Sequence, residues 1–251
     1  MTIESILHQT FTGFEYIIID GGSNDGSLHV IKEFADKITH WVSESDNGIY
    51  SAMNKGILKA QGEYLLFLNS GDWLADSEVL SNVFTKQQNA DIIYGHMNFV
   101  SGTTSMIRKA SAENEFSLAY FFTNSLCHPS TFIARRLFNG SLYDESYKIA
   151  ADKKFFIEKI IFQNCTIQRV DAIISNFPTT GITCNPEYKT LIKEENDRIF
   201  AGIATPRFAK DMEIYRSNYH DIQSVIKIRK YKLLYLIFKL LKKFSSFFQR
   251  F

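Results

Sequence analysis

Apolar and polar positions alternate in blocks along the first half of the chain, and the blocks predict strands and helices in turn. Apolar runs of strand length occur at 15–20, 39–44, 63–68 and 90–99. Segments with helical spacing of apolar residues stand before and between these runs, at 2–9, 28–35, 49–60 and 77–88. Strands that alternate with helices predict an α/β fold, in which a mostly parallel sheet is covered by helices on both faces.

The second half of the chain has a less regular pattern. It predicts a helix around 152–162, a strand within 165–178 and helical structure from 186 to the end. We find neither an internal repeat nor a low-complexity linker. The pattern therefore indicates one domain over residues 1–221, followed by a tail over residues 222–251.

Polar residues stand directly after two of the predicted strands, where sheets of this kind bind ligands. Asp20 ends one apolar run and opens the turn "GGSNDG". Asn69-Ser70-Gly71-Asp72 follows another, and Gly71 would let the backbone approach a ligand closely. The Asp72 carboxylate suits Mg²⁺ or Mn²⁺, and such an ion can neutralise a departing diphosphate.

Each of these carboxylates also has a purely structural interpretation. The turn after Asp20 could simply start the next helix, with Ser23 or Asp25 as its cap. Asp72 could likewise cap the helix that is expected near residue 77.

Two further residues in the second half are candidates for chemistry. Asp152 precedes a helix with a core-facing apolar side, so it is either a general base or an acid placed favourably at a helix N-terminus. His128 stands between Cys127 and Pro129 and could be a core histidine, a phosphate ligand or a contact to an acceptor.

Charge is distributed unevenly along the chain, whose net charge is +1. Residues 222–251 contain eight Lys or Arg and no Asp or Glu, whereas residues 1–221 contain 20 basic and 27 acidic residues. An acidic body argues against nucleic-acid binding, because such binders carry their basic surface on the folded domain. A basic tail favours an anionic partner surface.

The tail also has the pattern of an amphipathic helix. On a helical wheel of 233–248 one face is apolar, with Leu233, Ile237, Leu240, Leu241, Phe244, Phe247 and Phe248. The other face holds Tyr235, Lys239, Lys242, Lys243 and Ser246. We expect residues 226–251 to lie on an anionic membrane surface; the alternative is a terminal helix that docks on the domain or on a second subunit.

Cysteine usage and the N-terminal sequence bear on the compartment. Cys127, Cys165 and Cys184 are widely spaced and form no C-x-x-C pair, which argues against a disulfide framework or a zinc site. The first ten residues lack the pattern of a secretory signal, and no apolar run reaches the roughly 18 residues of a spanning helix. We therefore expect a cytoplasmic protein that is peripheral on the inner face of the cell membrane.

Four segments taken together carry a family resemblance. "EYIIIDGGSNDGS", "SESDNGIYSAMNKGILKAQGEYLLFLNSGDW", "CHPSTFIARRLF" and "LYDESYKIAADKKFFIEKI" resemble the family 2 glycosyltransferases of bacterial surface-polysaccharide synthesis. The resemblance covers roughly residues 1–185. It implies the GT-A fold, a nucleotide-sugar donor, a divalent cation and inversion at the anomeric carbon, with a glycan or lipid-linked molecule as acceptor.

The resemblance also implies roles for individual residues. Asp20 matches the carboxylate that binds the donor nucleoside, and Asp46 and Asn54 match the segment that lines the donor pocket. Asn69, Gly71 and Asp72 match the donor and metal motif, with Asp72 as the metal ligand. Asp152 matches the catalytic base, and His128 matches a histidine on the acceptor side.

The chain departs from the family pattern in two ways. Asp72 is the only carboxylate of the metal motif, and the usual first strand, of the type Ile-Ile-Thr-x-x-Tyr-Asn, is absent ahead of residues 2–9. Loss of a central strand would leave buried backbone groups unpaired, at about 1–3 kcal/mol each. We therefore expect low activity for 1–251, whether from a start site placed too far downstream or from an inactive copy.

Two other functions fit parts of the pattern. A membrane-associated scaffold with impaired catalysis would agree with the missing strand. A sugar-nucleotidyltransferase shares a similar architecture, but it would open with a Gly-rich loop that contains Arg and Lys, and the chain has no such loop.

Overall fold

A computed structural model describes the backbone of residues 1–203 and 206–248, and the side chains of these residues apart from 182, 206–209 and 243–248. The chain forms two compact units, Met1–Ile199 and Phe200–Phe251. The boundary expected at 221/222 therefore falls inside the second unit. The first unit contains all the strands that the structure describes.

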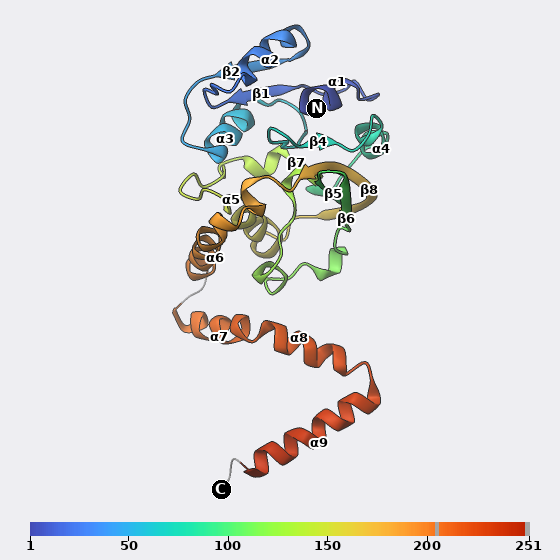
Figure 1. Cartoon of the computed structure of the whole chain (residues 1–251), viewed down its shortest axis with the longest axis vertical. Coiled ribbons are helices and arrows are strands. Elements are labelled where there is room, and N and C mark those ends of the chain that lie inside the picture. Colours follow the sequence, from blue (N-terminus) through green and yellow to red (C-terminus); the bar gives the residue numbers. More distant parts are fainter. Residues whose placement is uncertain (204–205, 249–251) are drawn as a thin grey trace. The chain divides into compact units, whose positions relative to one another are not determined.

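A parallel pair of strands opens the first unit. β1 (Ile17–Asp20) pairs with β2 (His40–Ser43), and α2 (Ser27–Glu33) connects them. α3 (Ile49–Lys59) follows β2 and packs against β1 (Figure 1). These elements confirm the predicted strands and helices of residues 15–60, since each has an apolar pattern long enough to be recognised locally.

A larger, mixed sheet forms the centre of the first unit. Its order is β3 (Tyr64–Leu65), β7 (Thr131–Ala134), β5 (Ile92–Ser101), β8 (Ile167–Pro178) and β4 (Trp73–Leu74), with β6 (Thr104–Arg108) on β5. Only β5 and β8 are parallel. The prediction of a mostly parallel sheet is wrong here, because a tight turn joins β5 to β6 and few of the strands follow a helical crossover.

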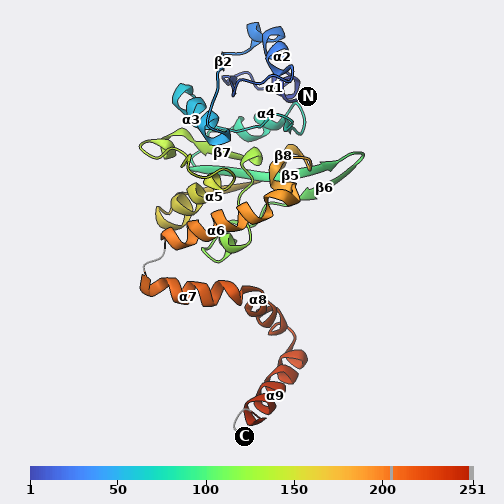
Figure 2. The same cartoon turned by 60° about the vertical axis from the view of Figure 1, so that its left-hand side comes forward.

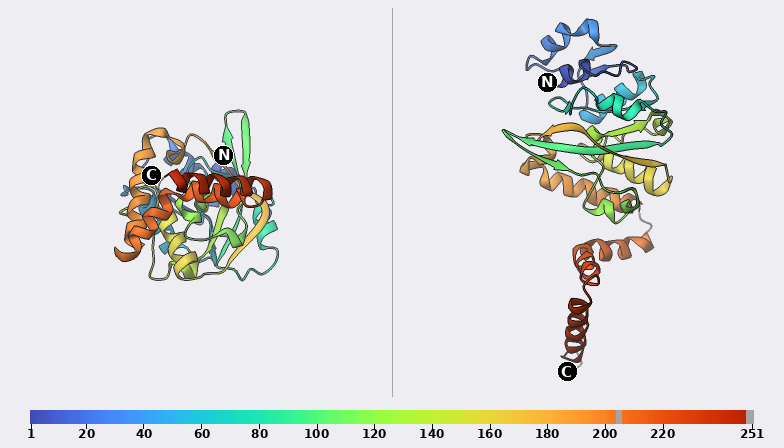
Figure 3. Two further views of the ribbon diagram at one scale, coloured as in Figure 1. Left: turned by 90° about the horizontal axis from the view of Figure 1, so that it is seen from below. Right: turned by 90° about the vertical axis from the view of Figure 1, so that its right-hand side faces the viewer.

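Helices cover the two faces of the mixed sheet, as the sequence predicts. α5 (Ala151–Phe156), which continues as a π-helix over Ile157–Phe162, lies on one face with α6 (Lys189–Ile203) (Figure 2). α1 (Thr2–Leu7) and α4 (Val79–Phe84) lie on the other face. The hairpin of β5 and β6 projects from the sheet (Figure 3), and all of β6 is exposed.

The core between α1, α4 and the sheet is aliphatic and aromatic. Its fully buried members include Val83, Ile93, Phe132 and Ile174. Burial of each such side chain stabilises the fold by about 1.5–3 kcal/mol. This core holds β4 and the start of the chain in place beside the turn at residues 69–72.

The second unit consists of helices. α7 (Pro206–Ser217), α8 (Tyr219–Ile228) and α9 (Lys232–Phe248) follow one another, as expected for the end of the chain. On α9, Leu233, Ile237, Leu240 and Leu241 are exposed. The side chains of Phe244, Phe247 and Phe248, which belong to the expected apolar face, lie outside the described residues. Among the described helices, none combines the length and apolar character needed to cross a bilayer.

The two sheets do not share a hydrogen-bonded strand among the described residues. There β1 pairs only with β2, and β3 only with β7. The predicted strand 63–68 is therefore too long: only Tyr64–Leu65 pairs, and 66–68 are half-buried without strand structure. An apolar segment adopts strand structure only where a neighbour supplies hydrogen bonds, and residues 66–68 have no such neighbour.

We predict that a strand of the type Ile-Ile-Thr-x-x-Tyr-Asn, added ahead of residue 1, raises both turnover and the midpoint of thermal denaturation. The reason is that it could pair with the open edges of β1 and β3. A Gly/Ser extension of equal length is the control, measured by nucleoside diphosphate release and by calorimetry. Equal turnover of 1–251 and the strand-extended chain would show that the two sheets need no joining strand.

Candidate active site

Asp20 lies at the carboxyl end of β1, with its side chain buried. Its Oδ2 accepts hydrogen bonds from Ser43 Oγ at 2.5 Å, Ser23 N at 3.1 Å and Gly22 N at 3.2 Å. Burial alone would raise the pKa of Asp20, but the bonds from Ser23, Ser43 and Gly22 outweigh it and lower the pKa. Asp20 is therefore a fixed anion at the end of the parallel pair.

Asp46 lies beside Asp20 along the sheet, in the turn after β2. Its Oδ1 accepts the Gly48 N–H at 2.9 Å. A Cβ atom at Gly21 would lie 2.6 Å from its Oδ2, so any larger residue at position 21 would displace the Asp46 carboxylate. The structure thus brings two of the predicted donor-side carboxylates together at the ends of β1 and β2. At the start of the next helix, α2, it is Asp25 that binds the backbone: its Oδ1 accepts the Ser27 N–H at 3.0 Å.

Asn54 is buried on α3 and does not line an open surface. Its Nδ2 donates to Tyr143 O at 2.9 Å and to Glu145 Oε1 at 2.8 Å, and its Oδ1 accepts the Tyr143 N–H at 2.9 Å. Every polar atom of the Asn54 side chain is thereby used inside the protein. The structure places this residue as a clamp on the loop that leads to α5, and not in the donor pocket that the resemblance implies.

Residues 69–72 form a tight turn beside the N-terminus. Asp72 N donates to Asn69 O at 3.0 Å, and Asn69 N donates to Asp72 Oδ2 at 3.0 Å. Gly71 has φ of +100°, a conformation that favours glycine, and its N–H donates to Thr2 Oγ1 at 3.1 Å. The side chain of Asp72 and the hydroxyl of Thr2 on α1 therefore fix the geometry of this turn.

The carboxyl of Asp72 is buried, because this residue is only 2% exposed. Burial raises its pKa to about 6, although His128 and the Asn69 N–H act in the opposite direction. Asp72 does not cap α4, because Asp76 Oδ1 accepts the Glu78 N–H ahead of that helix at 2.8 Å. A buried carboxyl that is hard to ionise is the kind of group that a cation would stabilise.

His128 connects the turn to Asp152. Asn69 Nδ2 lies 3.0 Å from His128 Nε2, within hydrogen-bonding distance. Nδ1 in turn lies 3.1 Å from Asp152 Oδ2, to which it donates. The imidazole of His128 therefore links residues 69 and 152, and the sequence predicts all three as site residues from three separate segments.

Asp152 lies in the first turn of α5 and is partly accessible, with 14% of its side chain exposed. Besides His128, its carboxylate contacts the Tyr50 hydroxyl at 3.1 Å and the Lys153 N–H at 2.7 Å, both through Oδ1. A carboxylate has about four acceptor positions, so one position stays open for a further hydroxyl. This geometry suits a general base.

Tyr50 is a site residue that the sequence pattern did not reveal. It is buried at the start of α3, and its hydroxyl also lies 2.6 Å from Ile149 O. Burial, and next the Asp152 carboxylate, raise the pKa of Tyr50, so it stays protonated and acts as a donor. Its only local signal is its place in "DNGIY", directly after the turn that holds Asp46.

The described residues hold no group of three or more His, Cys, Asp or Glu side chains that could bind a metal ion. Asp72 alone therefore provides a carboxylate at the predicted metal motif. One carboxylate fits Mg²⁺ or Mn²⁺ when donor phosphates and water complete the shell. The raised pKa of Asp72 agrees with such a role.

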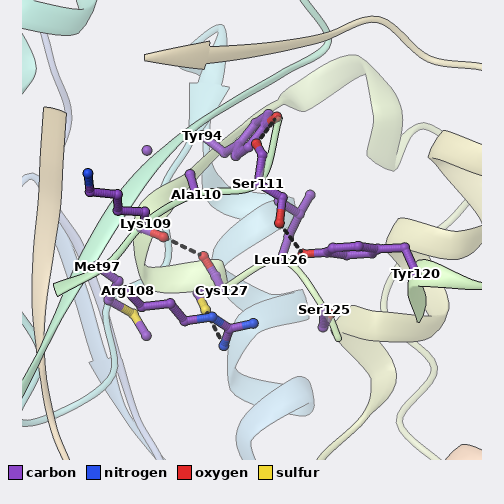
Figure 4. A pocket seen from close by; sticks show the side chains of 12 residues that line it. Tyr94, Met97, Arg108, Lys109, Ala110, Ser111, Tyr120, Ser125, Leu126 and Cys127 are labelled. Atoms are coloured by element: carbon purple, nitrogen blue, oxygen red, sulfur yellow. Dashed lines mark hydrogen bonds between the residues drawn. The ribbon is translucent and has the colours of Figure 1, made fainter. Parts of the chain in front are cut away.

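A small cavity lies next to the segment that contains His128 (Figure 4). Its volume is about 30 Å³, enough for about one water molecule. Tyr94 donates to Ser111 O at 2.9 Å, and Arg108 Nη1 lies 3.5 Å from Cys127 Sγ, as Figure 4 shows. Burial raises the pKa of Cys127, so this thiol stays protonated. The cavity is too small for a sugar, so the candidate active site is the region around Asp152 and not this cavity.

Solved structures share this fold. A crystal structure of *S. aureus* TarS residues 1–349 aligns with a TM-score of 0.58 at 19% identity, over 86% of this chain and 65% of that one. The mannosyltransferase PcManGT of *Pyrobaculum calidifontis*, in complex with GDP-Man and Mn²⁺, aligns with a TM-score of 0.58 at 14% identity, over 86% and 64%. These likenesses confirm the expected GT-A fold.

Sequence relatives point the same way. A PGL/p-HBAD biosynthesis glycosyltransferase of *Mycobacterium bovis* is 31% identical over 163 residues, which is 62% of this chain and 61% of that protein. The minor teichoic acid biosynthesis protein GgaB of *Bacillus subtilis* is 27% identical over 208 residues, or 77% of this chain and 21% of that protein. The chain thus spans less than two thirds of these relatives.

The family comparison covers the part of the chain that contains every predicted site residue. The model of "Glycosyl transferase family 2" matches residues 1–161, almost two thirds of the chain. Asp20, Asp72, His128 and Asp152 all lie within that match. The chain therefore belongs to glycosyl transferase family 2.

Proposed function

We propose that this protein is an inverting glycosyltransferase that moves a sugar from a nucleotide-sugar donor to a glycan or lipid-linked acceptor in cell-surface polysaccharide synthesis. The observation that carries the proposal is the bridge from Asn69 through His128 to Asp152. It links the turn proposed to face the donor diphosphate with a partly open carboxylate. Family membership and the names of the relatives supply the reaction class and its setting.

In the proposed reaction, Asp152 acts as general base. The acceptor hydroxyl donates to the open position of the carboxylate and then transfers its proton to it, while its oxygen attacks the anomeric carbon. The bond from that carbon to the diphosphate oxygen breaks from the opposite face, so the configuration inverts. His128 donates to the carboxylate, and the Tyr50 hydroxyl, whose one proton is shared between Ile149 O and Asp152 Oδ1, lies against it; together they hold it in one orientation.

The donor is proposed to lie along the carboxyl ends of the strands. Asp20 and Asp46 would accept hydrogen bonds from the nucleoside, as expected at this edge of an α/β sheet. TarS has been solved with UDP and with UDP-GlcNAc, and the mannosyltransferase with GDP-Man, which supports a nucleotide-sugar as the donor. A divalent ion held by Asp72 would stabilise the leaving diphosphate.

We predict that Asp152→Asn lowers release of nucleoside diphosphate by about 10²-fold or more, because an amide cannot accept the acceptor proton. The assay screens UDP-glucose, UDP-GlcNAc, UDP-galactose and GDP-mannose with Mn²⁺, with water as acceptor, and continues with the donor that is hydrolysed fastest.

Glu158→Gln, which removes a more exposed carboxylate from the same segment, is the control and should keep its turnover. Donor affinity, measured by calorimetry, should be the same in both variants. Full turnover by Asp152→Asn would overturn the assignment of the base.

We predict that Asp72→Asn stabilises the metal-free protein at pH 7.5 by up to about 3 kcal/mol. The pKa of this carboxyl is raised from 3.8 to about 6, so the folded state holds its proton more tightly than the unfolded state does. The resulting stability is fully present below pH 3.8, declines between pH 3.8 and 6, and is lost above pH 6. The asparagine variant escapes that loss.

The matching measurement is urea denaturation of both proteins at pH 5 and pH 7.5, followed by thermal shifts with MnCl₂ and the donor. The two proteins should differ more at pH 7.5 than at pH 5. Mn²⁺ should raise the denaturation temperature of the natural chain only. An equal Mn²⁺ response in the variant would remove Asp72 from the metal site.

A catalytically impaired scaffold is the second candidate, because β1 and β3 each have an edge that no other described strand pairs with. Donor hydrolysis that depends on Asp152 would exclude it. Release of pyrophosphate from a nucleoside triphosphate would favour a sugar-nucleotidyltransferase instead.

We further propose that residues 226–251 bind the anionic inner face of the cell membrane, where a lipid-linked acceptor would lie. α9 exposes Leu233, Ile237, Leu240 and Leu241, and residues 222–251 carry eight basic and no acidic residues. An exposed apolar stripe with flanking lysines is typical of interfacial helices.

We predict that deletion of 226–251 abolishes sedimentation with vesicles that contain phosphatidylglycerol. In the full chain, Lys239→Gln with Lys242→Gln should weaken binding about tenfold or more, since each lysine contributes roughly 1 kcal/mol at such a surface. Vesicles of phosphatidylcholine alone are the control. Unchanged binding by the deleted chain would refute the membrane role.

A further inference from the structure

The segment that leads into α5 is held by a carboxylate from outside the family match. Glu195, on α6, is buried, with 5% exposure. Its Oε1 accepts the Lys148 N–H at 2.6 Å, and its Oε2 accepts the Ile149 N–H at 3.0 Å and the Ala150 N–H at 2.9 Å. One side chain thus binds three consecutive backbone N–H groups.

These three N–H groups immediately precede the proposed base. Ala150 is the N-cap residue of α5, has no side chain able to cap it, and stands two residues before Asp152. A carboxylate at this end of the helix is favoured by the helix dipole as well as by its hydrogen bonds. Glu195 therefore fixes, from α6, the backbone that leads into the first turn of α5.

A second residue of α6 holds the same segment. Arg198 Nη2 donates to Ser146 O at 2.9 Å, and its guanidinium lies 3.6 Å from the centre of the Tyr147 ring. Arg198 is three residues from Glu195, so the two side chains leave the same side of the helix. Together they fasten residues 146–150.

The opposite side of this segment is held by α3. The Tyr50 hydroxyl contacts Ile149 O at 2.6 Å and Asp152 Oδ1 at 3.1 Å. The peptide groups next to the base thus lie between Glu195 and Tyr50. A shift of residues 148–150 away from Glu195 would carry Ile149 O, and with it the contacts of Asp152, out of place.

We propose that Glu195 is a positioning residue for the transfer reaction, which fixes the carboxylate of Asp152 by binding the backbone of residues 148–150. The inference rests on the proposed role of Asp152 as base. It assigns a function to α6, a helix that lies beyond the family match at residues 1–161.

A cavity next to Glu195 makes the proposal testable by chemical rescue. It has a volume of about 300 Å³ and is lined by Ser146, Lys148, Leu191, Glu194, Glu195 and Arg198. A small carboxylate could enter it and reach the three N–H groups when the side chain of Glu195 is shortened. Lys148 and Arg198 would favour an anion there.

The experiment compares Glu195→Gln, Glu195→Asp, Glu195→Ala and the exposed neighbour Glu194→Gln with the natural full-length chain. Donor binding by calorimetry gives the fraction of competent sites, and nucleoside diphosphate release from the fastest-hydrolysed donor gives turnover per competent site. Hydrogen exchange of the amides of 148–150 is followed in parallel. Asp152→Asn serves as reference for loss of the base.

In Glu195→Gln we expect at least tenfold lower turnover per competent site, KM for the donor within threefold of the natural value, and at least tenfold faster exchange at 148–150. Glu195→Asp should recover part of the turnover. Formate should raise the turnover of Glu195→Ala, whereas chloride at equal concentration should not. Glu194→Gln should match the natural chain.

Faster exchange at 148–150 with unchanged turnover per site would overturn the proposal, since Glu195 would then serve the fold alone. Unchanged exchange in Glu195→Gln would overturn it as well. If Asp152→Asn itself keeps full turnover, the proposed base is wrong, and that failure is separate from either result on Glu195.

Discussion

The hydrogen bonds of His128 are the contacts on which the arrangement of the site depends. The ring contacts Asn69 through Nε2 and donates to Asp152 through Nδ1, so its orientation is fixed from both sides. Asn69 belongs to a turn that Asp72 closes, and Asp152 belongs to α5. An imidazole with both nitrogens engaged is well suited to hold two segments at a fixed separation.

The burial of Asp72 lowers the stability of the folded protein near neutral pH. Its carboxyl is almost completely buried, and burial raises its pKa to about 6, which makes the ionised form unfavourable near neutral pH. A protein selected for stability alone would have an asparagine or an apolar residue there. The divalent ion that we propose at Asp72 would stabilise this carboxylate. Asp20 differs, because hydrogen bonds from Ser23, Ser43 and Gly22 stabilise its charge and lower its pKa without any ligand.

Local patterns predicted the elements whose stability is local. β1, β2 and α3 have apolar residues at the right period, and the structure has each of them. β3 ends after Leu65, although residues 66–68 have the same apolar pattern, because strand structure requires a partner that the pattern does not contain. Tyr50 and Glu195 escaped prediction for a related reason: their partners lie about a hundred and about fifty residues away in the chain. In the sequence "KEEN", Glu195 looks like an ordinary charged residue on the exposed face of a helix.

The site consists of two parts with different supports. Asp20 and Asp46 are held within the β1–β2 pair by their own turns and by Ser43, so this part depends on few distant residues. Asp152 is held by α3 through Tyr50, by His128 ahead of β7, and indirectly by α6. Small displacements in any of these elements change the orientation of the base but leave the Asp20 turn intact. The proposed donor binding and proton transfer therefore depend on different supports, and substitutions on α6 should affect turnover more than donor affinity. Because the turn that holds Asp46 leads directly into α3, that helix is the covalent connection between the two parts.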